Sequence, residues 1–286
     1  MVKEITVLSG KGGTGKTSVT GSLAVLAEKA VLTDCDVDAP DLHMLLKPEV
    51  LEKQEFKASR VAVMDKELCV QCGKCEDHCR FGAIESLLID PVLCEGCGVC
   101  EYICPVAAIE LEKRVSGYAF ISKTKYGPMS HALLNPGEEN SGKLVSLVRR
   151  NAKKVAEKEN CDLIINDGPP GIGCPVIASV GGADVGLIVV EPTLSGIHDM
   201  ERALGLLKHF KIPALVCINK YDLNEDNTAR IAEFCRSTGV KIVGKIPFDP
   251  IVTEAMVGGK SILEYSPGSR VSKAIEEMWK KTLENF

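Results

Sequence analysis

The stretch Ser9-Gly10-Lys11-Gly12-Gly13-Thr14-Gly15-Lys16-Thr17-Ser18 decides the fold of this chain. An apolar run at residues 5–8 precedes it, and a helix-like stretch begins near Thr17. Within it, the pattern G-x-x-x-x-G-K-[ST] is typical of a loop whose amides and following helix N-terminus bind phosphates. The sequence therefore predicts a nucleotide-binding loop between a strand and a helix.

Each residue of this loop is a candidate nucleotide contact. Glycines let the backbone approach the phosphate oxygens and adopt positive φ where needed. We expect Lys16 to reach the β- and γ-phosphates and the Thr17 hydroxyl to hold Mg²⁺. The alternative is a glycine-rich turn without a ligand. The predicted contacts are Gly10, Lys11, Gly12, Gly13, Thr14, Gly15, Lys16, Thr17 and Ser18.

A second lysine, Lys11, lies inside the loop in the order G-K-G-G-T-G-K-T. This order resembles the deviant phosphate loop of the MinD/ParA/Mrp group of ATPases, which includes nitrogenase iron protein. In that group the early lysine reaches the partner's phosphates across a nucleotide-sandwich dimer. The resemblance implies a homodimer in which Lys11 stabilises transition-state charge in trans, as an arginine finger does.

Composition limits the class of protein. At 286 residues the length suggests about two domains, and 45% hydrophobic residues can form a substantial core. The net charge of −5 and the 5% aromatic content argue against a nucleic-acid partner. No signal peptide or apolar run of roughly 20 residues is visible, which predicts a soluble cytoplasmic protein. For the thirteen cysteines, metal binding is then favoured over disulfides.

A cluster of carboxylates, Asp34-Cys35-Asp36-Val37-Asp38-Ala39-Pro40-Asp41, follows the second predicted strand at residues 30–33. Carboxylates this close repel one another, so a cation such as Mg²⁺ with a nucleotide is expected nearby. A solvated acidic loop is the alternative. The resemblance implies that this D-x-D is switch I, with Asp36 supporting Mg²⁺ and Asp38 positioning the attacking water as a catalytic residue beside Lys11 and Lys16.

Two cysteine runs form an internal repeat. Each has the spacing C-x₂-C-x₂-C-x₃-C, and the second follows the first at an offset of 25 residues. This run is typical of bacterial ferredoxins with two [4Fe–4S] clusters, in which the fourth cysteine of each run ligates the other cluster. One predicted set is Cys69, Cys72, Cys75 and Cys104; the other is Cys94, Cys97, Cys100 and Cys79.

Zinc is the alternative ligand for these cysteines, although four-cysteine zinc sites usually pair two C-x₂-C segments. The repeat departs from the ferredoxin pattern at one place, because Pro105 follows Cys104 whereas Arg80 follows Cys79. Arg80 is expected to raise the potential of the nearby cluster. We predict a ferredoxin-like domain at 58–114, inserted into an ATPase domain formed by 1–57 and 115–286.

The apolar strand at residues 161–166 ends in Asp167-Gly168-Pro169-Pro170-Gly171, a Walker-B-like arrangement. Asp167 is predicted to hold Mg²⁺ through water, and the two glycines give switch II freedom to respond to γ-phosphate. Cys174 follows this switch. Nitrogenase iron protein has a cluster ligand in a similar place, but a buried core position is the favoured interpretation, as it is for Cys35, Cys161, Cys217 and Cys235.

Two later segments are predicted to contact the base of the nucleotide. Asn219-Lys220-Tyr221-Asp222 matches the guanine-recognition motif N-K-x-D of GTPases. In the MinD/Mrp group the corresponding asparagine bonds adenine, and the loop that matches Pro247-Phe248-Asp249 lines the base pocket. The resemblance therefore favours ATP and ADP with Mg²⁺, with GTP as the alternative.

The remaining pattern alternates strands and helices, which predicts an α/β fold with a doubly wound, mostly parallel sheet and a small α+β insert. The closing helix at 271–283 is predicted to present Ile275, Met278, Trp279 and Leu283 on one core-facing stripe. Its glutamates oppose anionic lipid, so membrane binding is not expected.

The predicted function is an iron–sulfur ATPase. ATP closes the dimer and gates electron transfer or the binding of a redox or iron–sulfur partner protein. The alternatives are a scaffold or carrier that delivers clusters to apo-proteins, and a MinD-like positioning switch.

Overall fold

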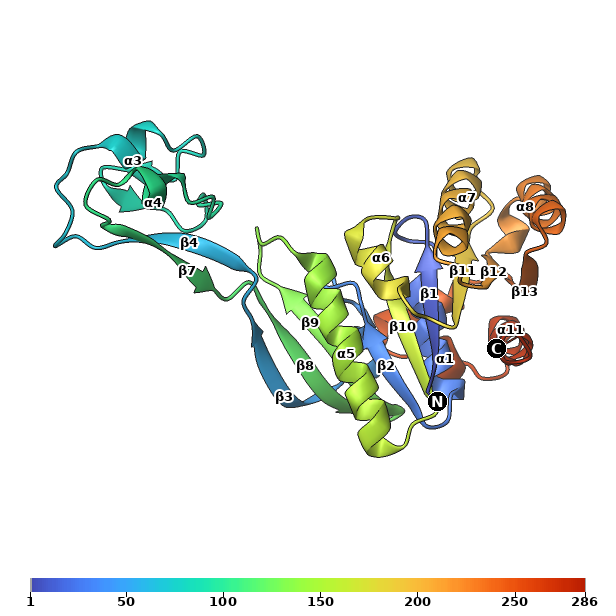
Figure 1. Cartoon of the computed structure of the whole chain (residues 1–286). Helices are drawn as coiled ribbons and strands as arrows, with labels where there is room; N and C mark the ends of the chain where they lie inside the picture. The colour runs from blue at the N-terminus through green and yellow to red at the C-terminus, as the bar shows by residue number, and fades with distance from the viewer. Residues whose placement is uncertain (1, 286) are drawn as a thin grey trace. The chain divides into compact units, whose positions relative to one another are not determined.

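The computed structural model describes residues 2–285, which divide into two compact units (Figure 1). Of the described residues, the large unit comprises 2–53, 119–133 and 141–285. The small unit comprises residues 54–118 and 134–140. No helix among residues 2–285 is long and apolar enough to cross a membrane.

One nine-stranded sheet is the framework of the large unit, with the strand order β13-β12-β11-β1-β10-β2-β9-β8-β3. Every neighbouring pair from β13 through to β9 is parallel. The strands are β1 (Lys3–Ser9), β2 (Ala30–Asp34), β3 (Glu49–Phe56), β8 (Gly117–Thr124), β9 (Gly127–Leu134), β10 (Leu163–Pro170), β11 (Val185–Val190), β12 (Ala214–Asn219) and β13 (Lys241–Ile246).

Both faces of the parallel strands are covered, so their sequences are almost continuously apolar. In β1, Ile5 and Val7 belong to the core on one face, and Leu8 belongs to the core on the other. The first face packs on α1 (Lys16–Leu26), α2 (Leu42–Leu46), α9 (Ile251–Val257), α10 (Ile262–Tyr265) and α11 (Arg270–Leu283). The second packs on α5 (Ser141–Glu159), α6 (Cys174–Val180), α7 (Leu194–His209) and α8 (Glu225–Thr238).

The neighbouring strands β1 and β10 are followed by connections that lead to opposite sides of the sheet. From β1 the chain passes through α1 to β2, which lies beyond β10, whereas from β10 it passes to β11, which lies beyond β1. Ligands of open α/β sheets bind outside the carboxyl ends of the strands at such a switch point. The glycine-rich loop at 10–15 leaves β1 at this position.

A hairpin extends the sheet beyond its parallel part. β8 and β9 are neighbours joined by only Lys125 and Tyr126, and a connection this short requires antiparallel strands. β3 is the last strand of the order, and its side chains are almost all exposed.

The small unit contains two short sheets and two short helices. β4 (Ser59–Met64) pairs antiparallel with β7 (Ile109–Arg114), and β5 (Ile84–Glu85) pairs antiparallel with β6 (Leu88–Ile89). The helices are α3 (Lys74–Asp77) and α4 (Val99–Ile103). Its buried core consists of Ala62, Cys75, Ala83, Ile84, Cys94 and Ile109, so two of its six members are predicted cluster ligands.

The predicted stripe of the closing helix is mostly confirmed. Ile275, Met278 and Trp279 are buried in α11, but Leu283 is 45% exposed. Leu283 is the last residue of the helix, and the neighbouring Thr282 takes the buried position of this turn instead. Its assignment to the core was wrong.

Candidate nucleotide and cysteine sites

The phosphate loop has a backbone that only glycine fits at two positions. Gly15 has φ +89°, and a Cβ there would lie 2.3 Å from Nδ2 of Asn219. A Cβ on Gly10 would lie 2.1 Å from Cβ of Asp199 in α7. The loop is thus packed between α7 and the end of β12, which fixes its position at the switch point.

A buried charged cluster lies behind the loop, at the start of α1. The Lys16 ammonium lies 2.9 Å from Oδ1 of Asp167. Thr17 donates to Oδ2 of the same carboxylate at 2.8 Å, and Thr20 donates to its Oδ1 at 2.8 Å. Asp167, within β10, therefore has both oxygens bound by α1 residues. Lys16 and Thr17, predicted from the loop pattern, and Asp167, predicted from the later strand, come together here.

Asp34 is a member of this cluster that sequence reasoning did not select. It is fully buried and lies opposite Asp167 in the register of β2 and β10. Its oxygens accept the backbone N–H groups of Asp36 and Leu42, each at 3.1 Å. The available signal was the ending of two apolar strands in aspartate, which places both carboxylates at one sheet edge.

The electrostatics of the cluster follow from burial and from these contacts. Burial, reinforced by Asp167, raises the pKa of Asp34 well above its ordinary value. Burial opposes the charge of Lys16, but the carboxylates of Asp167, Asp34 and Asp36 outweigh it and raise the pKa of the ammonium. Lys16 is thus held as a cation in a buried position, which suits it to phosphate binding.

The two carboxylates of the predicted switch I differ in position. Asp36 lines the nucleotide cavity described below and accepts the N–H of Ala39 at 3.3 Å. Burial raises its pKa, against the effect of Lys16. Asp38 is exposed and is not among the lining residues.

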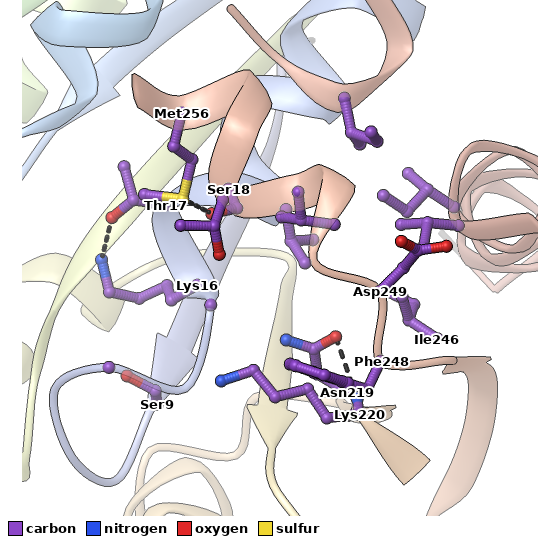
Figure 2. A pocket seen from close by; sticks show the side chains of 18 of the residues that line it. Ser9, Lys16, Thr17, Ser18, Asn219, Lys220, Ile246, Phe248, Asp249 and Met256 are labelled. Atoms are coloured by element: carbon purple, nitrogen blue, oxygen red, sulfur yellow. Dashed lines mark hydrogen bonds between the residues drawn. The ribbon is translucent and has the colours of Figure 1, made fainter. Parts of the chain in front are cut away.

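A cavity of about 270 Å³ extends from the phosphate loop toward β12 and β13 (Figure 2). One side is formed by Lys16, Thr17 and Ser18, and another by Asn219 and Phe248. Predicted residues that line it are Gly12, Gly13, Gly15, Lys16, Thr17, Ser18, Asp36, Asn219 and Pro247. Gly10, Lys11, Thr14, Asp38 and Asp167 are not among its lining residues.

Two side chains of the N-K-x-D segment brace the base end of the cavity. Asn219 donates to the carbonyl of Thr14 at 2.8 Å, joining β12 to the phosphate loop. Asp222, in the short helix η1 (Tyr221–Leu223), accepts the N–H of Phe248 at 2.7 Å. Asp222 does not itself line the cavity, so it supports the wall formed by Pro247 and Phe248.

Lys11 is directed away from the cavity of its own chain. Its Nζ donates to Oγ of Ser195 at 3.2 Å, at the start of α7. Lys11 and Lys16 therefore occupy different surroundings, although only four residues lie between them in the loop.

The eight cysteines of the repeat line two cavities of the small unit. Four of them, Cys69, Cys72, Cys75 and Cys104, line one, which we call the first cavity. The other four, Cys94, Cys97, Cys100 and Cys79, line the second cavity. Each predicted ligand set is therefore gathered around one space. In each set one cysteine, Cys72 or Cys97, is exposed.

Backbone donors are directed at both sets. Ala108 donates to Sγ of Cys104 at 3.2 Å, and Ala62 donates to Sγ of Cys94 at 3.4 Å. Among residues 2–285, no three His, Cys, Asp or Glu side chains converge closely enough to hold a single metal ion.

The cysteines outside the repeat fall into two groups. Cys35, Cys161, Cys217 and Cys235 are buried as predicted. Burial raises the pKa of the Cys35 and Cys217 thiols to about 12, so both remain neutral core groups. Cys174 is exposed as the first residue of α6, and the prediction that it packs in the core was wrong. The chain leaves the core after β10, and α6 buries Val176 and Val180 instead.

Comparisons with known proteins agree with this fold and loop. The family model CbiA, described as the CobQ/CobB/MinD/ParA nucleotide binding domain, matches residues 5–262. The septum site-determining protein MinD from Pyrococcus horikoshii, solved in complex with Mg-ADP, superposes with a TM-score of 0.61 at 18% identity, covering 99% of this chain and 96% of that one. At this identity the likeness shows the fold.

Two relatives extend the comparison. An uncharacterized protein of Methanocaldococcus jannaschii is 38% identical, covering 99% of this chain and 98% of that protein. An iron-sulfur cluster carrier protein of Aquifex aeolicus is 25% identical, covering 94% of this chain and 64% of that protein. This chain belongs to the CobQ/CobB/MinD/ParA nucleotide-binding family, and its mostly parallel sheet is a MinD-like P-loop fold.

Proposed function

We propose that this protein is a Mg²⁺-dependent ATPase that closes as a homodimer and controls the redox function of two [4Fe–4S] clusters. The observation that carries the proposal is the presence, in one chain, of a P-loop nucleotide cavity and of two cavities that each gather one complete ligand set. In this proposal, residues 58–114 form a ferredoxin-like insert in an ATPase domain of residues 1–57 and 115–286.

The charged cluster suggests how nucleotide binding begins. Lys16 and Thr17 both contact Asp167. Phosphate oxygens would draw the Lys16 ammonium away from this carboxylate, because they are the stronger anionic partner for a P-loop lysine. Asp167 and Thr17 would then be free to hold Mg²⁺ together with Asp36. The ion would neutralise phosphate charge and orient the leaving group when it is bound.

Hydrolysis requires groups that do not line the cavity. Asp38 is exposed, so switch I must move before its carboxylate can position water at the γ-phosphate. Lys11 contacts Ser195 and would act on the partner's nucleotide instead. The positions of Asp38 and Lys11 outside the cavity lining are consistent with a site that dimer closure completes. In that site Lys11 would act as an arginine finger does.

The base pocket favours adenine. Asn219 lines the cavity, but Asp222, which would recognise guanine in an N-K-x-D motif, does not and bonds Phe248. An adenine amino group would meet Asn219 and the backbone of the Pro247–Phe248 wall.

The cysteine cavities fit the proposed clusters by the chemistry of their donors. Each offers four thiols and at least one backbone donor to sulfur, and such donors stabilise thiolate ligands. When bound, the clusters supply one-electron chemistry. Closure at switch I and switch II would change how the small unit is presented to an electron-transfer partner, which is the gating that we propose.

A mixing experiment tests the dimeric mechanism. Lys11→Ala and Asp38→Ala should each abolish ATP hydrolysis. In a mixed dimer one composite site retains both groups, so mixing equal amounts should restore about a quarter of wild-type activity if Lys11 acts in trans. Absence of restoration, with nucleotide-dependent dimers still formed, would place Lys11 in its own site and contradict this mechanism.

The redox part is tested on anaerobically purified protein. Iron and sulfide should each be eight per chain, and EPR of the reduced protein should change on adding non-hydrolysable ATP. Signals that do not respond to nucleotide would contradict gating. Arg114→Gln offers a control change in the small unit away from both cysteine cavities.

The likeness to an iron-sulfur cluster carrier protein favours one alternative, delivery of clusters to apo-proteins. Exposed Cys174 could assist it from the large unit. Transfer of iron and sulfide to an apo-ferredoxin, lost in Cys174→Ser while the eight resident iron atoms remain, would favour delivery over electron transfer. Retention of iron throughout would favour electron transfer.

A further inference from the structure

The two cysteine cavities are related by the repeat but differ in the charges that line them. At the 25-residue offset, Lys74 corresponds to Val99, Val70 corresponds to Glu95, and Arg80 corresponds to Pro105. The exchange of these residues places different charges around otherwise equivalent ligand sets.

The first cavity has one charged lining residue, Lys74, and no carboxylate among the described residues that line it. The second cavity is lined by Arg80 and Glu95 together, with His78. Arg80 lies over the ring of Phe81, 5.9 Å from its centroid, and Phe81 lines the same cavity. Arg80 and Glu95 therefore bring opposite charges to the lining of the same cavity.

We propose that the first site, formed by Cys69, Cys72, Cys75 and Cys104, has the higher reduction potential. The inference rests on the proposed function, in which both sites hold a [4Fe–4S] cluster. A one-electron reduction adds one negative charge at a site, and a nearby cation stabilises that charge. Lys74 does so unopposed, whereas the effects of Arg80 and Glu95 largely cancel.

This proposal adds to the expectation from the sequence, in which Arg80 raises the potential of the second site. The structure brings Glu95 to the same cavity as Arg80, although fifteen residues separate them in the chain. Lys74, Arg80 and Glu95 are all exposed, so water and salt screen their effects. The difference between the two potentials should therefore narrow as ionic strength rises.

The test is an anaerobic redox titration followed by EPR, with dithionite as the electron donor through soluble mediators, on wild type and three single variants. Lys74→Gln should lower the higher midpoint and leave the other unchanged. Arg80→Gln should lower the lower midpoint, and Glu95→Gln should raise it. Lys66→Gln, a lysine of the same unit outside both sets of lining residues, is the control and should move neither.

The outcomes separate this inference from the proposed function. Fewer than eight iron atoms per chain in the wild type would contradict the two-cluster proposal itself. Eight iron atoms with Lys74→Gln moving the lower midpoint, or neither midpoint, would overturn the inference and leave the two-cluster proposal standing. Because the variants retain His78, its contribution is constant at a fixed pH.

Discussion

The nucleotide site of the large unit and the cysteine cavities of the small unit differ in the protein contacts that hold them together. In the nucleotide site, Lys16, Thr17 and Thr20 satisfy both oxygens of Asp167. The largest core of the large unit contains twenty-six buried residues, whereas the core of the small unit contains six. Contacts between protein side chains hold the nucleotide site, whereas the small apolar core of the small unit is typical of domains that need a metal or a cross-link to be stable.

The largest expected effect is the loss of the small unit's structure when iron is removed. Cys75 and Cys94 occupy two of its six core positions, and ligand binding by cysteines is coupled to folding. After chelation, amide hydrogen exchange in residues 59–114 should approach that of an unfolded chain, while β1, β10 and β11 remain protected.

A matched pair of variants sharpens this prediction. Cys75→Ser should reproduce the loss of hydrogen-exchange protection in the small unit. Cys161→Ser, which changes a buried cysteine of the large unit, should leave the iron content of the protein unchanged. Equal protection of the small unit with and without iron would show that its fold does not depend on the clusters.

The free energy of unfolding of the large unit should fall in acid because of His131 in β9. Burial, with a smaller effect from His43, lowers the pKa of His131 from 6.5 to about 4. As pH falls below 6.5 the unfolded chain binds a proton that the folded chain does not, so stability is lost progressively down to the folded pKa. At pH 5 the loss should be about 2 kcal/mol.

Urea unfolding of the large-unit signal at pH 7 and pH 5 measures this loss, with Trp279 fluorescence as the probe. His131→Gln cannot titrate and can still hydrogen-bond Ser122, which lies 2.8 Å from the imidazole. Its difference between the two pH values should be smaller by about 2 kcal/mol. An unchanged difference would show that carboxylates, not His131, set the acid limit.

Much of the large unit could be predicted because its signals are local. The predicted strands at residues 5–8 and 30–33 lie within β1 and β2, since buried parallel strands are almost continuous apolar runs. The residues Lys16 and Thr17 lie within one loop motif, and their neighbours in the chain are their neighbours in the site.

The rest depends on contacts between distant segments. Asp34 joins Asp167 only through the register of β2 and β10, and Glu95 joins Arg80 only through the fold of the small unit. Spacing cannot reveal such pairs. Cys174 was assigned to the core because free cysteines are usually buried. It is exposed because the chain has already left the core at Pro170, the last residue of β10.

The smallest effect concerns how the protein shapes the base end of its nucleotide cavity. Asp222→Ala removes the acceptor for the N–H of Phe248 and should weaken ATP binding about tenfold, because this hydrogen bond holds the wall of the cavity. Asp222→Asn retains an acceptor oxygen and should bind ATP nearly as wild type does, as measured by calorimetry with Mg²⁺. A carboxylate that recognised guanine would behave differently, since the amide would lose GTP binding as the alanine does. Equal loss of ATP affinity in both variants would mean that Asp222 acts through its charge, and the nucleotide site would then be less fully formed by the protein's own contacts than Lys16 and Asp167 suggest.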